Sequence, residues 1–468
     1  MWPSRAAAYP AAARTAAFRA RPAQRACYAR PVDRTPLVDT YQFPVSKPKE
    51  IRAVCNPSMP LLPADDALHE DLSAVQGGPR FEKIENRIRM ADRGQFVREL
   101  VTGHAGSGKS TELLRLAARL RQPKETQSFH VVYIDAFEHL SQWGIRLPHI
   151  IVALVAGLVK EQREDLKETR SAKTLAARIK ALVTNVSGEI AKSIDSLTQI
   201  PVLTAMLRTN QEFSARFRDQ AVTQIQDLLR LLNDLVAEVS QALNVEIVFI
   251  VDNLEKIPEQ SAEGAASLHE ALFVRDLPLL DIPAHLVLTY PISLNYSSAE
   301  LPRAFPSASK TTLPMVGVRL PPGADERGDD PDGIAALRHL LLKRVKRDVF
   351  ANDEAIDHVI RSSGGCVRDL MRFVGELPIV GNPPFTRDHV DLAVQDFKND
   401  YERVMQGKPY VRNLREIEQS GRIPDDLAPD SKSEILLGLV VLAYHTDTWF
   451  DVHPLAKRTR TFVAARNG

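Results

Sequence analysis

Hydrophobic and polar positions repeat along the chain with two different periods. Four short runs rich in β-branched and aromatic residues predict buried strands, at 96–101 (FVRELV), 129–134 (FHVVYI), 245–251 (VEIVFIV) and 285–290 (HLVLTY). Between these runs, apolar residues recur every three or four positions, which is typical of amphipathic helices. The succession of strand, glycine-rich turn, helix and strand at 96–134 predicts a parallel α/β fold, with a parallel sheet flanked by helices.

The region 147–243 is predicted to be mostly helical, and its last part carries a heptad-like apolar seam. The seam consists of Val222, Ile225, Leu229, Leu232, Val236, Val239 and Leu243. A long helix packed on its own domain and an arm for a coiled-coil dimer both fit this spacing. The longest apolar run, 150–159, is too short to span a bilayer, so we expect no membrane contact.

The remaining segments complete a prediction of four parts. Residues 302–332 have the composition of a loop or linker. Beyond it, we expect a helical lid at 333–400 and then helices followed by a hairpin at 411–460, which suggests a winged-helix-like module. We place the core at 61–310, with a helical insertion at about 160–243, and expect little structure in a leader at 1–60.

Charge divides the chain unevenly. It holds 60 Lys and Arg against 59 Asp and Glu, a net charge of +1, but the first 32 residues contain six arginines and no acid. Residues 33–468 therefore carry 54 bases and 59 acids, a mildly acidic body that argues against a nucleic-acid-coating protein. The leader has the composition of an organelle transit peptide, or is a segment outside the native protein.

Several classes of chemistry lack support in this sequence. The three cysteines, Cys27, Cys55 and Cys366, are widely separated and form no CxxC pair, so neither a zinc site nor a disulfide framework is indicated. The sequence contains no HExxH and no GxSxG motif. We expect a reducing compartment, the cytoplasm, with the mitochondrion as the alternative if the leader is a transit peptide.

The strongest chemical signal lies between the first predicted strand and the helix that follows it. It reads Gly103, His104, Ala105, Gly106, Ser107, Gly108, Lys109 and Ser110, matching GxxxxGK[ST], and Thr111 follows. Glycines let backbone N–H groups converge on phosphate oxygens, and the helix N-terminus turns its positive end toward the same anion. Lys109 would neutralise the β- and γ-phosphates, and the Ser110 hydroxyl would ligate Mg²⁺. We therefore expect ATP and Mg²⁺ as cofactors.

Two acids follow the strand at 245–251. Asp252 stands at the strand end, where a carboxylate can hold the water shell of the metal. Glu255 comes three positions later and could polarise the attacking water, or it is a loop acid paired with Lys256. Our candidates for catalysis are therefore Glu255, Asp252 and Lys109.

These motifs resemble a known family in their order. GHAGSGKST (103–111), FIVDNLEK (249–256), HLVLTYPISL (285–294) and SSGGCVRDLMRF (362–373) are similar to the Walker A, Walker B, sensor 1 and lid elements of AAA+ and STAND-type P-loop ATPases. The resemblance covers about 65–400. Most AAA+ proteins have Glu directly after the Walker B Asp, whereas this chain has Asn253, which is closer to the STAND pattern.

The resemblance implies roles for further residues. Thr289 matches the sensor 1 position, and Arg368 matches the lid arginine called sensor 2. His453 lies in a segment similar to the Met-His-Asp motif of STAND proteins, where the histidine touches ADP, although Val452 and Pro454 replace its neighbours. An arginine finger would come from a neighbouring subunit, and the candidates are Arg275, Arg303 and Arg319.

Three functions fit these features. The first is a nucleotide-driven switch that binds and hydrolyses ATP, forms homo-oligomers and controls a separate effector or partner protein. The second is a nucleic-acid-handling ATPase of the origin-recognition or loader kind, for which the basic run 457–460 could contact phosphates, although the acidic body disfavours it. The third is a module that binds ATP without hydrolysing it.

Overall fold

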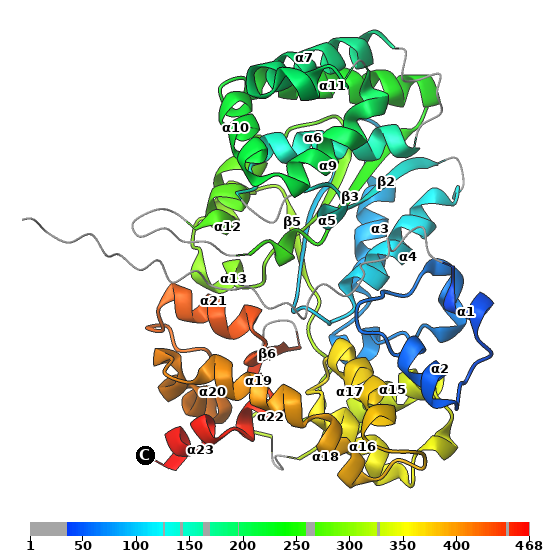
Figure 1. The fold of residues 1–468 in the computed structure, drawn as a ribbon, viewed down its shortest axis with the longest axis vertical. Coiled ribbons are helices and arrows are strands. Elements are labelled where there is room, and N and C mark those ends of the chain that lie inside the picture. Colours follow the sequence, from blue (N-terminus) through cyan, green and yellow to red (C-terminus); the bar gives the residue numbers. More distant parts are fainter. Residues whose placement is uncertain are drawn as a thin grey trace, which may run out of the picture. The chain divides into compact units, whose positions relative to one another are not determined.

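A five-stranded parallel sheet forms the centre of the fold (Figure 1). The strands run in the order β2 (Phe129–Asp135), β3 (Glu246–Asp252), β4 (His285–Thr289), β1 (Arg98–Thr102) and β5 (Ser309–Thr312). Every neighbouring pair is parallel, and in the β2/β3 pair Asp135 stands opposite Asp252. This arrangement confirms the predicted α/β fold class, a parallel sheet flanked by helices.

The computed structural model describes residues 35–124, 127–140, 144–161, 169–194, 196–258, 267–324, 328–445 and 449–467. The Arg-rich part of the expected leader, residues 1–32, lies outside these ranges. In the described part of the chain, no helix combines the length and the apolar character needed to cross a membrane.

Two layers of helices cover the two faces of the sheet. α3 (Arg80–Met90) and α4 (Lys109–Arg121) pack on one face, where they bury Val131, Val248 and Ile250. The alternate strand residues face the other way, into a core shared with α6 (Leu147–Glu161) and α11 (Ile225–Leu243). Both faces of the strands are thus apolar, which explains the nearly continuous hydrophobic runs in the sequence.

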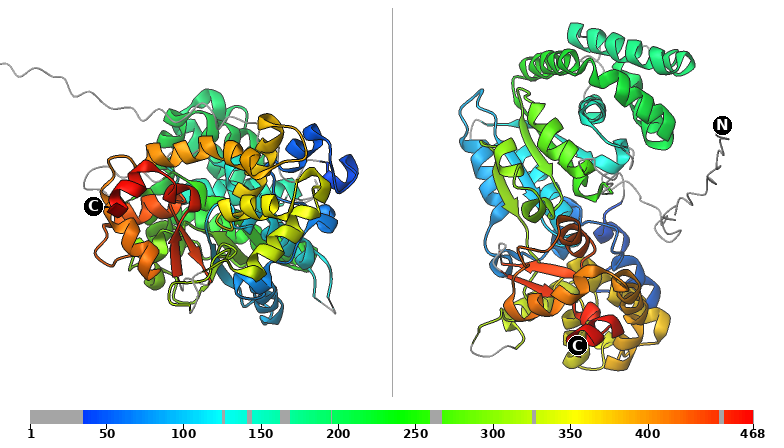
Figure 2. Two further views of the ribbon diagram at one scale, coloured as in Figure 1. Left: turned by 90° about the horizontal axis from the view of Figure 1, so that it is seen from below. Right: turned by 90° about the vertical axis from the view of Figure 1, so that its left-hand side faces the viewer.

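The predicted helical insertion forms a bundle beyond the sheet (Figure 2). Its further helices are α7 (Arg170–Val186), α8 (Gly188–Ala191), α9 (Ile200–Thr209) and α10 (Gln211–Val222). α11 contacts α7 and α6, and the seam residues Leu232, Val236 and Val239 are at most 1% exposed within this bundle. The middle of the seam is therefore buried within the chain's own bundle, whereas its two ends, Val222 at the end of α10 and Leu243 at the end of α11, are 41% and 37% exposed.

The structure differs from our expectation for residues 35–60, which we had assigned to an unstructured leader. They form α1 (Leu37–Thr40) and α2 (Pro48–Val54), and Ile51 is fully buried where α2 packs on α17. Val45 pairs with Val345 of the lid in a parallel bridge. The apolar residues of this segment are irregularly spaced because each one fits the lid separately, so no helical or strand period marks them.

The lid and the C-terminal module complete the chain. The lid has four helices, α15 (Pro331–Leu342), α16 (Asp353–Ser362), α17 (Val367–Val380) and α18 (Arg387–Ala393). The module contains α19 (Gln395–Met405), α20 (Leu414–Ser420), α21 (Pro429–Leu437), the antiparallel hairpin β6 (Val441–Tyr444) and β7 (Trp449–Val452), α22 (Pro454–Lys457) and α23 (Arg460–Asn467). Helices thus precede a hairpin, as in the predicted winged-helix-like module.

The segment 302–332 also differs from the loop that we expected, because it contains the edge strand β5.

Shorter elements connect the main ones. These are η2 (Pro63–Leu68), η3 (Ser73–Gln76), α5 (Ala136–His139), η5 (Leu197–Gln199), η6 (Leu254–Lys256), α12 (Leu268–Glu270), η7 (Ala271–Asp276), η8 (Leu277–Leu279), α13 (Leu294–Ser297), α14 (Leu301–Ala304), η9 (Arg347–Val349) and η10 (Pro409–Asn413).

Candidate functional site

The glycine-rich loop connects the end of β1 to the start of α4. Gly103, Gly106 and Gly108 have φ angles of +145°, +95° and +105°, a region that residues with a side chain rarely adopt. At Gly103 a Cβ atom would also lie 2.2 Å from the Leu313 carbonyl oxygen. The motif glycines are therefore required by the backbone, and the loop leads directly into the positive end of α4.

Lys109 is buried at the first position of α4, with 4% of its surface exposed. Its Nζ donates hydrogen bonds to the carbonyl oxygens of Gly103 (2.8 Å) and His104 (2.9 Å). The same Nζ lies 3.4 Å from Oε1 of Glu255. Burial lowers the pKa of Lys109, although the nearby carboxylates of Glu255 and Asp252 oppose this shift. A cation thus stands at the loop with one acid beside it.

Asn253 explains how an acid three residues after Asp252 reaches the loop. Asn253 has φ +67°, in the left-handed region that asparagine tolerates better than most residues. The chain therefore turns sharply after β3, and the short helical turn η6 brings Glu255 back toward Lys109. An acid three residues after Asp252 thus lies beside the loop lysine.

Two groups hold Asp252 at the end of β3. The Tyr133 hydroxyl donates to its Oδ2 (2.7 Å), and the Asn253 N–H donates to its Oδ1 (2.7 Å). Asp252 is fully buried, and this burial, together with the charge of Glu255, raises its pKa. A hydrogen bond with Ser110 opposes that rise and joins Asp252 to the start of α4.

Two nearby lysines favour the ionised form of Glu255. Burial alone would raise the pKa of Glu255, but the charges of Lys109 and Lys256 hold it below its ordinary value. Its Oε2 is buried and has no hydrogen-bond partner among the described residues. An ionised carboxylate with one free oxygen beside the loop has the properties that a general base or a water-positioning group requires.

Thr289 lies under the turn that carries Glu255. It is fully buried at the end of β4, and its Oγ1 accepts a hydrogen bond from the Leu254 N–H (3.0 Å). A hydrogen bond from Thr289 also helps to lower the pKa of Glu255. The expected sensor residue is thus placed against the turn, between the strands β3 and β1.

The donor set near the loop suits Mg²⁺. Ser110 and Asp252 supply oxygen atoms and are joined by a hydrogen bond, and the free Oε2 of Glu255 lies nearby. Mg²⁺ needs only one or two protein oxygens when phosphates and waters complete its shell. No group of three or more His, Cys, Asp or Glu residues in the described part of the chain is placed to hold a metal ion without such additional ligands.

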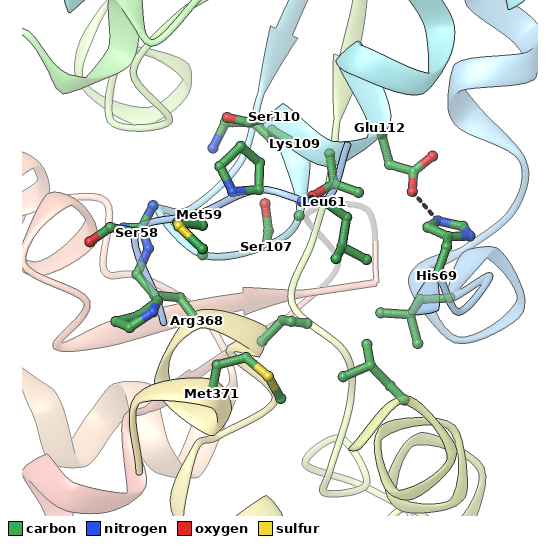
Figure 3. Close-up of a pocket in the computed structure, with 18 of the residues that line it drawn as sticks. Ser58, Met59, Leu61, His69, Ser107, Lys109, Ser110, Glu112, Arg368 and Met371 are labelled. Atoms are coloured by element: carbon green, nitrogen blue, oxygen red, sulfur yellow. Dashed lines mark hydrogen bonds and ion pairs between the residues drawn. The ribbon is translucent and has the colours of Figure 1, made fainter. Parts of the chain in front are cut away.

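A cavity of about 150 Å³ opens beside the loop (Figure 3). The loop and α4 form one wall, and the N-terminal segment, with Met59 and Leu61, forms another. Arg368 and Met371 of the lid helix α17 close the third side. Residues 54–61 could not be predicted as part of the site, because the segment has no motif and no regular period.

The remaining predicted residues take different positions. The Thr111 hydroxyl accepts a hydrogen bond from the Leu61 N–H (3.2 Å), which fixes the N-terminal segment to α4. Ser107 is buried, and its Oγ has no partner among the described residues. The Arg368 N–H donates to the Gly106 carbonyl (3.3 Å), and Arg368 lines the cavity. Ala105 faces Cys366, whose Sγ lies 3.7 Å from the Ala105 carbonyl oxygen.

His453 does not line the cavity. It is fully buried in the C-terminal module, where its Nε2 lies 3.5 Å from Oδ2 of Asp369 and its ring stacks on Tyr401 at 4.7 Å. Asp369 follows Arg368 directly, so His453 is one side chain removed from the cavity wall. Among the arginine-finger candidates, Arg275 and Arg303 are exposed, and Arg319 is half-buried.

The chain is similar to solved structures only at low sequence identity. No family model matches the chain, and no curated protein matches it. Among solved structures, the Walker-type ATPase of Pyrococcus abyssi is similar with a TM-score of 0.44 and 14% identity, covering 86% of this chain and 97% of that chain.

Two further structures are similar at lower scores. Drosophila ORC bound to DNA has a TM-score of 0.37 and 12% identity, covering 92% and 94% of the two chains. The ORC2 protein of Aeropyrum pernix has a TM-score of 0.34 and 13% identity, covering 83% and 93%. At scores below 0.5 these likenesses carry no functional argument. The glycine-rich loop, the order of the strands and the buried Lys109 and Glu255 support a P-loop nucleotide-binding site.

Proposed function

We propose that this chain is an ATP-binding and ATP-hydrolysing P-loop switch of the AAA+/STAND type. One observation carries the proposal: Nζ of the loop lysine Lys109 and Oε1 of Glu255 lie 3.4 Å apart beside three glycines with positive φ angles. Glycine-rich loops of this kind bind phosphates through their N–H groups. Hydrolysis requires in addition a group that orients or activates water, and an adjacent carboxylate can do this.

Each residue has a distinct role in this proposal. Without nucleotide, Lys109 Nζ contacts the Gly103 and His104 carbonyls and Glu255. On nucleotide binding it exchanges part of these contacts for the β- and γ-phosphates. Ser110 and Asp252 hold the metal shell. Glu255, ionised and with one oxygen free, orients a water molecule for attack on the terminal phosphate.

When bound, Mg²⁺ neutralises charge on the phosphate oxygens during transfer. This chain provides the oxygen donors for it and keeps them in place. The Tyr133 hydroxyl fixes one carboxylate oxygen of Asp252, and the Asn253 N–H fixes the other.

The contacts between the loop and the lid support a switching role. The backbone of Arg368 bonds to the Gly106 carbonyl, and its side chain borders the cavity, so a phosphate in the loop would meet the lid directly. Nucleotide state can then change the lid position, and through it an oligomeric interface or a separate effector protein. Arg303 is exposed at 80% of its side chain and is available to a neighbouring subunit.

ATP binding by the wild type and by Lys109→Ala tests the nucleotide assignment. Calorimetric titration with MgATP should show binding by the wild type and a loss of at least tenfold in affinity in Lys109→Ala. Lys83→Ala, which removes an exposed lysine of α3, is the matched control and should bind as the wild type does. Equal binding by Lys109→Ala and wild type would refute the P-loop assignment.

Sizing in the presence of ADP, ATP and a non-hydrolysable analogue tests the switch. A nucleotide-driven switch should change its mass or shape between ADP and the analogue, as measured by light scattering. A chain that binds ATP without switching would give the same profile in all three. The experiment therefore separates the first function from the third.

The nucleic-acid-handling alternative finds little support in the basic run 457–460. Lys457 lies 2.6 Å from Asp451 and 3.1 Å from Glu418, and Arg458 lies 3.2 Å from Asp391. Lys457 and Arg458 are thus paired with acids of the chain itself and have less charge available for phosphates, which leaves the exposed Arg460 as the remaining base of the run. If duplex DNA at low salt changes the ATPase rate, the alternative gains weight over an effector switch.

A further inference from the structure

His104, inside the glycine-rich loop, directs its side chain away from the cavity and into the C-terminal module. His104 is 1% exposed, whereas Gly106, Ser107 and Gly108 of the same loop line the cavity. The Ala443 N–H of β6 donates to His104 Nε2 (2.8 Å), so this nitrogen is the acceptor. Nδ1 then carries the proton and donates to the Leu436 carbonyl at the end of α21 (3.1 Å). Both partners lie more than 330 residues away in the sequence.

The next two loop residues contact the lid instead. The Ala105 carbonyl oxygen lies 3.7 Å from Cys366 Sγ, and the Gly106 carbonyl accepts from the Arg368 N–H. A Cβ on Gly106 would lie 2.6 Å from both Cys366 Sγ and Arg368 Cβ, so the approach is as close as a glycine allows. Three successive loop residues, 104–106, are thus in contact with the module or the lid.

Ala443 joins three parts of the chain. Its N–H bonds to His104, and its carbonyl accepts from the Met315 N–H (3.0 Å) in the segment that follows β5. Next to it, the Tyr444 hydroxyl donates to the Gly364 carbonyl of the lid (2.7 Å). Two adjacent residues of β6 thus bond to the loop, to the segment after β5 and to the lid. His104 makes the bonds on the side of the loop.

We propose that His104 is a positioning residue that couples the nucleotide-binding loop to docking of the C-terminal module. This inference rests on the proposed nucleotide site and adds its regulation. Phosphate binding requires the loop N–H groups to converge, and a loop held from behind by His104 is already in that shape. Release of the module frees the loop and weakens nucleotide binding. By thermodynamic linkage, bound nucleotide stabilises docking of the module by the same factor.

The coupling explains why a bulky, polar side chain occupies a variable position of the loop. A small residue would leave the buried Ala443 N–H without this partner, which is costly. It would also remove one of the two hydrogen bonds that the Leu436 carbonyl accepts, the other coming from the Leu439 N–H (3.4 Å). The imidazole satisfies both at once and does so only while β6 and α21 are docked. His104 therefore reports the position of the module to the loop without touching the nucleotide.

Hydrogen exchange on the full chain tests the docking half of this proposal without any nucleotide. His104→Ala should speed exchange of the amides in β6, Ala443 above all, by about tenfold or more, because docking loses two hydrogen bonds. His104→Asn, which keeps a donor near the Nδ1 position, should restore part of the protection. His389→Ala removes a half-buried histidine of α18 that caps only its own helix, and it should leave β6 unchanged. Unchanged exchange of Ala443 in His104→Ala would overturn the docking contact.

The same measurement with MgATP tests the coupling. In the wild type, nucleotide should slow exchange in β6, and in His104→Ala this added protection should disappear while the affinity for MgATP falls by roughly three- to tenfold. A purely structural role would loosen the module but leave the nucleotide-induced protection intact, which would refute the coupling. If the wild type binds no nucleotide, the proposed function fails, whereas the docking role of His104 is still decided by the nucleotide-free experiment.

Discussion

Replacing Asn253 separates the shape of the turn after β3 from the chemistry of the acid that it carries. Asn253 has φ +67°, and its side-chain amide bonds to the Asp135 carboxylate. Asn253→Gly keeps the left-handed backbone at no steric cost but loses the bond, a loss of about 1 kcal/mol in the free energy of unfolding. Asn253→Ala loses the same bond and also the polar side chain that lets asparagine tolerate the left-handed region, a conformation that costs other residues with a Cβ about 1 to 2 kcal/mol. We therefore expect Asn253→Ala to be destabilised by about 2 kcal/mol.

The order of the two variants is the informative result. In an ordinary helix or strand glycine is the more destabilising residue, whereas here alanine should be worse by about 1 kcal/mol. Displacement of Glu255 by about 1 Å should also reduce ATP turnover in Asn253→Ala by up to about a hundredfold, and less in Asn253→Gly. Urea unfolding followed by fluorescence, together with steady-state ATPase assays, measures both. If Asn253→Ala is as stable and active as Asn253→Gly, the left-handed turn does not position Glu255.

Three further predictions concern other parts of the chain. Leu232→Ala, at a fully buried position of α11, should lower the free energy of unfolding by about 2 to 5 kcal/mol and leave the mass in sedimentation unchanged; dissociation would show that the seam is an intersubunit contact. Burial lowers the pKa of His104 from 6.5 to about 3, so the unfolded chain binds a proton that the folded chain does not. The contribution of His104 to the free energy of unfolding should therefore be fully present above about pH 6.5 and be lost as the pH falls toward 3. The free energy of unfolding, measured by urea unfolding at a series of pH values, should depend less on pH in His104→Asn. An equal pH dependence in the two proteins would contradict this. Lys457→Ala should leave the anisotropy of labelled duplex DNA unchanged, because Lys457 is paired with Asp451, and weaker DNA binding in this variant would count against that pairing.

Local patterns in the sequence predicted the centre of the fold well. The strands β2, β3 and β4 are nearly continuous apolar runs because both faces of the sheet are covered, and such runs can be recognised in a single sequence. The loop at 103–110 could be recognised because positive φ angles require glycine at fixed spacing. The helical region was found from its period, although the period could not show whether the seam of α11 packs within the chain or against a second copy.

Non-local contacts could not be predicted in the same way. The edge strand β5 has the sequence SKTT, which is short and polar, so only its pairing with β1 identifies it. Met59 and Leu61 line the cavity through an irregular segment with no motif. The approach of Glu255 to Lys109 depends on the backbone of one asparagine, and the partner of His104 lies in a strand that begins 337 residues later. Hydrophobic period and motif spacing carry no information on such pairings.

Turnover by Glu255→Gln tests the central claim, that this P-loop site hydrolyses ATP with Glu255 beside the phosphates. The substitution keeps the size of the side chain and a hydrogen-bonding oxygen but removes the charge that orients and polarises water. At saturating MgATP we expect turnover to fall by about a hundredfold or more, while the affinity for MgATP stays within a few fold of the wild type. Glu416→Gln, at an exposed position of α20, is the matched control and should hydrolyse ATP at the wild-type rate. Equal turnover in Glu255→Gln and wild type would contradict the account.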